Sequence, residues 1–173
     1  MLENGVLPEL HSLARDLADM PTPRRLRLER RRLALRVAIG DLAGCDDLTA
    51  VTHALSDFAD RALDSAIVTA IAERTPDAPV QGFTAIALGK QGSRELNYSS
   101  DIDPILLFDP LRLARRPRDD AGEAADHLAR QIVQILSRVD AEGYVLRVDL
   151  RLRPASEVSP LALPVEAALT HYE

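Results

Sequence analysis

Hydrophobic residues recur every three or four positions through the first half of the chain, which is the spacing of helices that bury one face. Two helices are predicted before residue 75, the first ending near Gly44 and the second capped by Asp46 or Asp47. Their predicted buried faces are Leu26, Leu33, Val37 and Leu42 in the first helix, and Leu48, Val51, Leu55, Phe58, Ala62, Leu63, Ala66, Ile67, Ala70 and Ile71 in the second. We therefore expect a helical segment over residues 24–75, preceded by an N-terminal arm over residues 1–23 with a short helix at residues 10–17.

Shorter apolar runs follow this segment. Residues 83–88 and 105–108 each have the length and composition of a short buried strand. Helical spacing then returns, and a third helix is expected from Asp119 or Asp120 to a stop at Gly143. Its predicted buried face is Ala125, Leu128, Ile132, Ile135, Leu136 and Val139.

The clearest strand pattern covers residues 144–153, where apolar and polar side chains alternate without a break. One face would carry Tyr144, Leu146, Val148, Leu150 and Leu152, and the other Arg147, Asp149, Arg151 and Arg153. Together with the two shorter runs, this strand predicts an α+β fold. A core over residues 76–173 would consist of a small mixed sheet with flanking helices, preceded by the helical segment.

Composition narrows the class of protein. The chain has 173 residues, 46% hydrophobic and 28% charged, and its formal net charge of −6 argues against nucleic-acid binding over the whole surface. No apolar run approaches the roughly 18 residues of a membrane span and no signal segment opens the chain, so we expect a cytoplasmic protein without membrane contact. The single cysteine, Cys45, excludes an internal disulfide, and we expect it to be a small packed thiol.

The candidate chemistry is concentrated in residues 89–109, whose sequence is GKQGSRELNYSSDIDPILLFD. Its glycines permit a tight turn and the close approach of a ligand to the backbone. Asp101 and Asp103 stand two apart at the start of the second strand, which would place both carboxylates on one face. Adjacent carboxylates repel each other unless a cation lies between them, and Mg²⁺ uses one or two carboxylates together with substrate phosphates. A surface turn with solvated aspartates is the alternative.

Asp149 would add a third carboxylate from the polar face of the long strand. The arginines around it could hold phosphate oxygens, or could simply form a salt-bridged outer face that adds little stability. Combined with Asp101 and Asp103, Asp149 favours the functional interpretation. Three carboxylates on two strands behind a glycine turn suit phosphoryl or nucleotidyl transfer with two metal ions about 4 Å apart.

Residues 87–108, VDLRLRP at 148–154 and SPLAL at 159–163 resemble bacterial glutamine synthetase adenylyltransferase/adenylyl-removing enzymes. That family belongs to the DNA polymerase β-like nucleotidyltransferases, and the similarity extends over about residues 24–173. Its enzymes carry two catalytic domains: the N-terminal one removes AMP from a tyrosine of glutamine synthetase by phosphorolysis, releasing ADP, and the C-terminal one attaches AMP from ATP. Residues 95–97 and 147–151 are more similar to the N-terminal, deadenylylating domain.

By this resemblance, the carboxylates that bind Mg²⁺ or Mn²⁺ are Asp101, Asp103 and Asp149. The phosphate turn would be formed by Gly89, Gly92 and Ser93, with Lys90 and Ser100 as further candidate nucleotide contacts. Arg151 and Arg153 are candidate phosphate contacts because of the strand pattern and not because of a family assignment. The implied partners are glutamine synthetase, orthophosphate with ADP or else ATP, and in the full-length enzyme a PII-type signalling protein, all in the regulation of nitrogen assimilation.

Three departures from the family pattern bear on activity. Pro104 stands where an aliphatic residue is usual and removes a backbone donor beside Asp103, Ser93 replaces a usual glycine, and the chain ends at Glu173, so a fragment is expected. Two other functions stay open. One is a catalytically inactive fragment that binds glutamine synthetase or a regulator through its helices, and the other is nucleotidyl transfer to a different acceptor.

Overall fold

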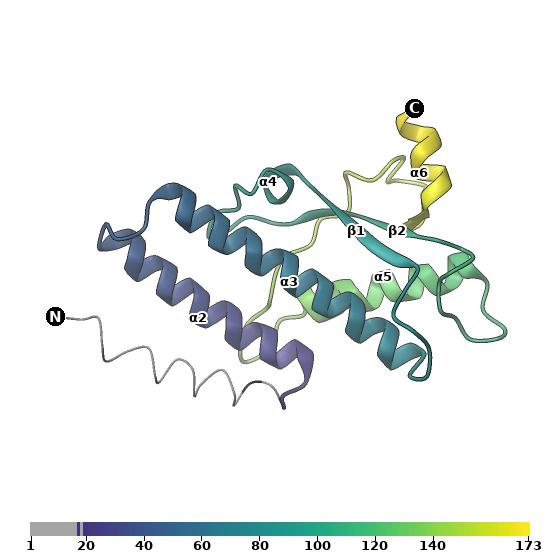
Figure 1. Ribbon diagram of the computed structural model, residues 1–173, viewed down its shortest axis with the longest axis horizontal. Coiled ribbons are helices and arrows are strands. Elements are labelled where there is room, and N and C mark those ends of the chain that lie inside the picture. The colour runs from purple at the N-terminus through teal and green to yellow at the C-terminus, as the bar shows by residue number, and fades with distance from the viewer. Residues whose placement is uncertain (1–16, 18) are drawn as a thin grey trace.

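The computed structural model describes residues 17 and 19–173, so the short helix predicted at residues 10–17 lies almost wholly outside the described residues. The chain forms an α+β fold, which confirms the predicted fold class (Figure 1). In chain order the elements are α2 (Thr22–Leu42), α3 (Leu48–Arg74), β1 (Phe83–Leu88), α4 (Gly89–Gly92), β2 (Asp103–Phe108), α5 (Ala121–Ser137), β3 (Ala162–Pro164) and α6 (Val165–Tyr172). None of the described helices is long and apolar enough to cross a membrane.

The two long helices α2 and α3 lie side by side, joined by a tight turn (Figure 1). Asp47 caps α3, because its carboxylate accepts a hydrogen bond from the Ala50 N–H at 2.8 Å. The predicted faces are buried, or half-buried at Leu33 and Leu55, except at their ends. The exposed members lie at or beyond a helix terminus: Leu42, Leu48 and Val139. Cys45 lies in the turn between α2 and α3 and is exposed, so the expectation of a packed thiol was wrong.

Three strands form a mixed sheet in the order β1-β2-β3. The antiparallel pairing of β1 with β2 runs from Phe83 opposite Phe108 to Leu88 opposite Asp103, and β3 joins β2 in parallel. Alternate residues of β2 face opposite sides: Leu106 packs in the core with α3 and α5, whereas Ile105 packs with Ala168 of α6. Because both faces of this central strand are covered, its sequence is apolar almost throughout.

The strand predicted at residues 144–153 is absent as a strand. One parallel bridge joins Val148 to Ile102, in which the Ile102 N–H donates to the Arg147 carbonyl at 2.9 Å and the Asp149 N–H to the Ile102 carbonyl at 2.8 Å. The next rung of a parallel ladder would need an N–H at position 104 to donate to the Asp149 carbonyl. Pro104 has no N–H, so the ladder stops after one rung.

Pro104 is nevertheless tolerated within the central strand, because no hydrogen bond to β1 requires an N–H at this position. The hydrogen bond from the Asp109 N–H to the Gly82 carbonyl, at 3.0 Å, fixes which pairs of the β1–β2 ladder are hydrogen-bonded. Counting by twos along the register, Pro104 and its partner Ala87 form a non-hydrogen-bonded pair. The missing donor therefore affects only the side of β2 that faces Asp149.

Helix α5 also ends earlier than predicted, at Ser137 and not near Gly143. Arg138 adopts an extended conformation with ψ of 126°, and its carbonyl accepts a hydrogen bond from Nη2 of Arg27 at 3.1 Å. This buried arginine of α2 thus stabilises the point at which the chain leaves the helix. Gly143 instead closes a tight turn with Asp140.

Candidate active site

The glycine segment forms a single helical turn, α4, directly after β1. Gly89 has φ of 53°, in the left-handed region, so the chain can reverse there without a side-chain clash. A Cβ at Gly92 would lie 2.6 Å from the Ala87 carbonyl oxygen, so this second glycine is needed for the close return of the turn onto β1. The compact form of the turn therefore depends on both glycines, Gly89 and Gly92.

Asp103 lies directly against this turn. It is the first residue of β2 and pairs with Leu88, and a Cβ at Gly89 would lie 2.8 Å from its Oδ2 atom. Burial raises the pKa of the Asp103 carboxyl above its usual value, and the negative charges of Asp149 and Asp101 raise it further. The fold therefore brings Asp101 and Asp149 close enough to Asp103 to disfavour its negative charge.

Arginines already compensate two of these charges. Nε of Arg147 donates to Oδ1 of Asp101, and its Nη2 donates to the Ser99 carbonyl. Nε of Arg151 donates to both Asp149 oxygens, at 3.0 and 2.9 Å, and this hydrogen bonding lowers the pKa of Asp149. Asp101 and Asp149 are thus ion-paired, whereas Asp103 has no ion pair with any residue that the structure describes.

Carboxylate oxygens suit a hard divalent cation, but the side-chain conformations of the three aspartates do not form a complete set of metal ligands. Mutual repulsion at Asp103 is the condition that a bound cation relieves. Within residues 17 and 19–173, however, no three acidic, histidine or cysteine side chains are arranged to hold a metal ion. Metal binding would require the carboxylates of Asp101 and Asp149 to turn away from Arg147 and Arg151.

The other predicted nucleotide contacts in the glycine segment are one residue near the carboxylates, Lys90, and two that form hydrogen bonds within the loop, Ser93 and Ser100. Lys90 belongs to α4, and its charge acts on Asp103, so it lies near the carboxylates. The Ser93 hydroxyl contacts Glu95 Oε2 at 3.0 Å, and the Ser100 hydroxyl contacts Asn97 Oδ1 at 2.9 Å. Both serines therefore stabilise the loop around the site in this conformation.

Arg153 donates to four backbone carbonyls of its own loop, those of Leu150, Ser156, Ser159 and Pro160. Its guanidinium therefore stabilises the segment that leads from Asp149 to β3. A role for Arg153 in phosphate binding stays a prediction, and it would require some of these hydrogen bonds to break.

Sequence reasoning missed how α3 holds the glycine turn. Gln91, only 3% exposed, donates through Nε2 to Asp60 Oδ1 at 2.8 Å, and Arg94 forms an ion pair with Asp57. The Arg94 hydrogen bond lowers the pKa of Asp57. These acids are 31 and 37 residues upstream of their partners, so no local pattern could have paired them.

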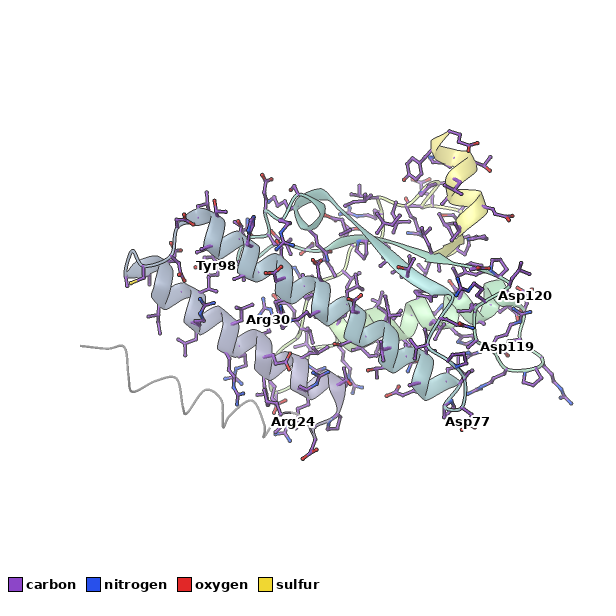
Figure 2. All side chains as sticks on the ribbon, in the orientation of Figure 1. Arg24, Arg30, Asp77, Tyr98, Asp119 and Asp120 are labelled. Atoms are coloured by element: carbon purple, nitrogen blue, oxygen red, sulfur yellow. The ribbon has the colours of Figure 1, made fainter. Side chains whose placement is uncertain are left out.

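A second anchor reaches α2. The Tyr98 hydroxyl donates to Asp41 Oδ2 at 2.9 Å, which ties the loop after the turn to the end of α2. Figure 2 labels Tyr98 and Arg30 beside the two long helices. Arg30 of α2 stacks over the Tyr144 ring, 4.7 Å from its centroid, and Arg147 lies on that ring at 6.0 Å. The Tyr144 ring thus links the helical segment to the arginine that pairs with Asp101.

Comparison with known proteins gives the site a context. A family model for glutamate-ammonia ligase adenylyltransferase matches residues 8–173, which include all the residues of this site. The chain belongs to the glutamate-ammonia ligase adenylyltransferase family. This membership confirms the resemblance drawn from residues 87–108.

Relatives of the family are named bifunctional glutamine synthetase adenylyltransferase/adenylyl-removing enzyme in Rhizobium meliloti, Agrobacterium fabrum and Xanthobacter autotrophicus. They are 38%, 39% and 39% identical to the chain, over 91%, 96% and 87% of its length. The matches cover only 17%, 19% and 16% of the relatives, so the chain spans less than a fifth of those adenylyltransferases.

Proposed function

We propose that the chain is a nucleotidyltransferase unit that acts on glutamine synthetase, in the direction that removes AMP from adenylyl-tyrosine. The observation that carries this proposal is Asp103, set against the glycine turn and flanked by the charges of Asp101 and Asp149. Family membership and the names of the relatives support the substrate class. The motif at residues 147–151, more similar to the deadenylylating domain, supports the direction.

In this reaction an orthophosphate oxygen forms a bond to the adenylyl phosphorus, the bond from phosphorus to the tyrosine oxygen breaks, and ADP leaves. The released tyrosine oxygen takes up a proton. The turn at α4 would lie beside the phosphates, and Lys90 and Arg151 would supply positive charge to their oxygens. The adenylyl group would thus be positioned between the turn and the three carboxylates.

Asp101, Asp103 and Asp149 would hold Mg²⁺ or Mn²⁺ once the arginine pairs of Asp101 and Asp149 open. The ion would neutralise the charge that accumulates on the transferring phosphoryl group. Arg147 and Arg151, which pair with two of these carboxylates, would also be within reach of the phosphates. Without substrate and metal, the two arginines therefore compensate the charges of Asp101 and Asp149.

The test is release of ADP from adenylylated glutamine synthetase in the presence of the full chain, orthophosphate and Mg²⁺. Asp103→Asn should abolish release, whereas Asp64→Asn should leave it unchanged, because Asp64 is an exposed residue of α3 with no hydrogen bond or ion pair to the described part of the chain. Equal ADP release by both variants would exclude Asp103 from the chemistry.

The same assay separates the other functions. Transfer of AMP from ATP to unmodified glutamine synthetase, without ADP release, would reverse the proposed direction. Transfer to other acceptors alone would change the substrate. Binding of glutamine synthetase that survives in Asp103→Asn, with no turnover by either protein, would identify a binding fragment.

A further inference from the structure

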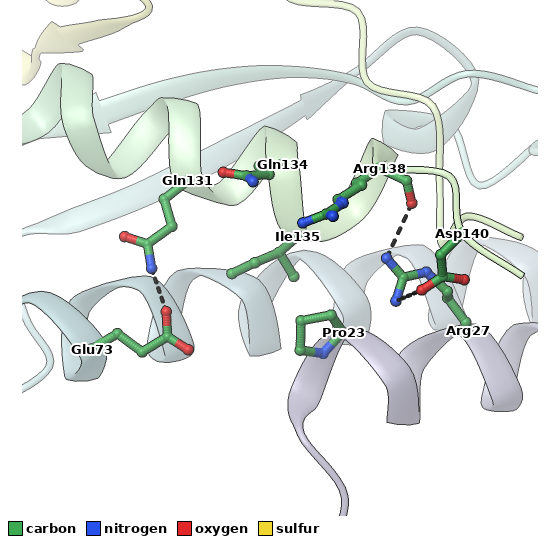
Figure 3. A pocket seen from close by; sticks show the side chains of 8 residues that line it. All are labelled: Pro23, Arg27, Glu73, Gln131, Gln134, Ile135, Arg138 and Asp140. Atoms are coloured by element: carbon green, nitrogen blue, oxygen red, sulfur yellow. Dashed lines mark hydrogen bonds and ion pairs between the residues drawn. The ribbon is translucent and has the colours of Figure 1, made fainter. Parts of the chain in front are cut away.

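Helix α2 holds the segment that follows α5 through three arginines spaced three residues apart, which is a spacing of neighbours on a helix surface. The first, Arg24, forms an ion pair with Glu142 at 2.9 Å. The second, Arg27, is buried and forms an ion pair with Asp140, also at 2.9 Å (Figure 3). These two contacts fix residues 138–143 against α2.

The third arginine of this row, Arg30, contacts Tyr144, the next residue along the segment. Its guanidinium lies over the Tyr144 ring, 4.7 Å from the centroid. The chain directly after the ring is held by backbone hydrogen bonds, because the N–H groups of Val145 and Leu146 both donate to the Leu136 carbonyl at 3.0 Å. Tyr144 is therefore fixed by α2 at its ring and by α5 through its neighbours.

Tyr144 in turn contacts Arg147, the arginine that pairs with Asp101. Nη1 of Arg147 donates to the Tyr144 hydroxyl at 3.2 Å, and the guanidinium lies 6.0 Å from the ring centroid. With the hydrogen bonds to Asp101 and to the Ser99 carbonyl, every nitrogen of this guanidinium has a partner. Arg147 is thus held on Asp101 by groups other than Asp101 itself.

Arg151 is held less firmly on Asp149. Within the described chain, the side-chain hydrogen bonds of Arg151 all go to this one carboxylate, two residues away, and the side chain is 85% exposed. An exposed ion pair of this kind costs little to break. Asp149 is therefore easier to free for a metal ion than Asp101, whose arginine has three further contacts.

We propose that Tyr144, held by Arg30, is a positioning residue that keeps Arg147 on Asp101 and thereby lowers the affinity of the site for a divalent cation. Arg147 must leave Asp101 before a cation can bind there, and the apparent affinity falls with the fraction of molecules in which Asp101 is free. This inference rests on the metal site of the proposed function. It adds that helix α2 controls that site through Tyr144.

Titration of the full chain with Mn²⁺ without orthophosphate, followed by the EPR signal of the free ion, measures this affinity independently of turnover. Tyr144→Leu leaves the charge of the site unchanged and should bind Mn²⁺ about three- to tenfold more tightly, because Arg147 loses a hydrogen bond and a ring contact. Tyr144→Phe, which keeps the ring and its packing, should give a smaller gain. Tyr98→Phe is the matched control, since the Tyr98 hydroxyl contacts Asp41, and it should leave the affinity unchanged.

Two arginine variants test the link to α2. Arg30→Gln and Arg31→Gln remove the same charge from adjacent positions of the helix, but only Arg30 lies over the Tyr144 ring. Arg31 is exposed and has no hydrogen bond or ion pair within the described chain. Arg30→Gln should therefore raise the affinity for Mn²⁺ more than Arg31→Gln does, and equal affinities of the two variants would overturn the control by α2.

Equal affinity for Mn²⁺ in Tyr144→Leu and the wild type would overturn the role of Tyr144. Weaker binding by Tyr144→Leu would also overturn it, because Arg147 would then orient Asp101 as a metal ligand. Asp103→Asn separates both results from a failure of the proposed function. Mn²⁺ binding that is absent from the wild type, or unchanged in Asp103→Asn, would overturn the metal site and this inference with it.

Discussion

Asp103 and Asp149 lie at one site, yet their surroundings move their pKa values in opposite directions. Burial and two neighbouring carboxylates raise the pKa of Asp103, whereas hydrogen bonds from Arg151 lower that of Asp149. Asp103 is also the carboxylate that touches the glycine turn. The group with the least compensated charge is thus the one nearest to where phosphates would bind.

This difference predicts a pH dependence. Because the folded pKa of Asp103 exceeds its usual value of 3.8, folding favours its protonated form, and its contribution to stability falls as pH rises from 3.8 through the folded pKa. Asp103→Asn removes this loss, so the variant should gain stability relative to the wild type across that window. Urea unfolding at several pH values measures the difference, with Asp64→Asn as the control. A difference that does not change with pH would contradict the raised pKa.

The two glycines Gly44 and Gly89 allow the cost of backbone strain to be separated from that of crowding. Both have positive φ, 66° and 53°, but a Cβ would meet nothing within 4 Å at Gly44 and would meet the Asp103 carboxylate at Gly89. Gly44→Ala should destabilise the fold by about 1–2 kcal/mol from left-handed strain alone. Gly89→Ala should lose somewhat more, because the Asp103 carboxylate must turn away from the added Cβ. Denaturant unfolding of the two variants measures this, and equal losses would mean that Asp103 moves aside freely.

At the scale of elements, Pro104 decides the form of the segment that carries Asp149. On the side of β2 that faces this segment, Ile102 forms one bridge with Val148, and the next position that should donate an N–H is Pro104, which has none. The segment therefore runs beside β2 as an extended chain and does not become a fourth strand. Asp149 is held by backbone pairing on its N–H and by Arg151, but its carbonyl receives no bond from position 104.

Pro104→Val should extend the sheet. The new N–H can donate to the Asp149 carbonyl, which adds about 0.5–1.5 kcal/mol, while the loss of proline rigidity removes about 0.4–1 kcal/mol. Overall stability should therefore change little, but residues 147–151 should acquire strand-like chemical shifts and slower amide exchange. Unchanged shifts at these residues, in a variant that stays folded, would show that something other than Pro104 limits the ladder.

At the scale of the whole molecule, one hydrophobic core joins the helical segment to the sheet. Leu26 of α2, Phe58 of α3, Leu106 of β2 and Leu128 of α5 belong to the same buried cluster. The helices over residues 24–75 thus cover one face of the sheet and also position the glycine turn through Asp57 and Asp60. The division into a helical segment and a core over residues 76–173 stays a prediction.

A truncation tests that division. A chain of residues 76–173 would expose the face of β2 and α5 that now packs against α3, so we expect it not to fold, and the full chain to unfold in one cooperative transition. Circular dichroism and amide-proton dispersion of the truncated chain provide the measurement. A well-dispersed spectrum from residues 76–173 would make the core an independent domain.

Local patterns were enough to locate the long helices and the two longer strands. The stripe of α3, its cap at Asp47 and the positions of β1 and β2 were all readable, because each depends on neighbours within a few residues. The expected burial of β1 was wrong, because its residues are half-buried or exposed, whereas β2 is buried from Pro104 to Phe108. The alternation at residues 144–153 was misleading, since strand formation there requires an N–H donor at position 104, far away in the sequence, where proline has none. The pairing of Arg147 with Asp101 across 46 residues was hidden for the same reason.

The exposed thiol of Cys45 has a practical consequence for work on this protein. It is the single cysteine of the chain and lies in the turn between α2 and α3, where two molecules could approach each other. Under oxidising conditions a covalent dimer linked through this residue would double the apparent mass and cause errors in measured binding stoichiometries. Cys45→Ser, or a reductant, keeps the chain monomeric in this respect, and the native thiol offers a position for attaching one fluorophore per chain.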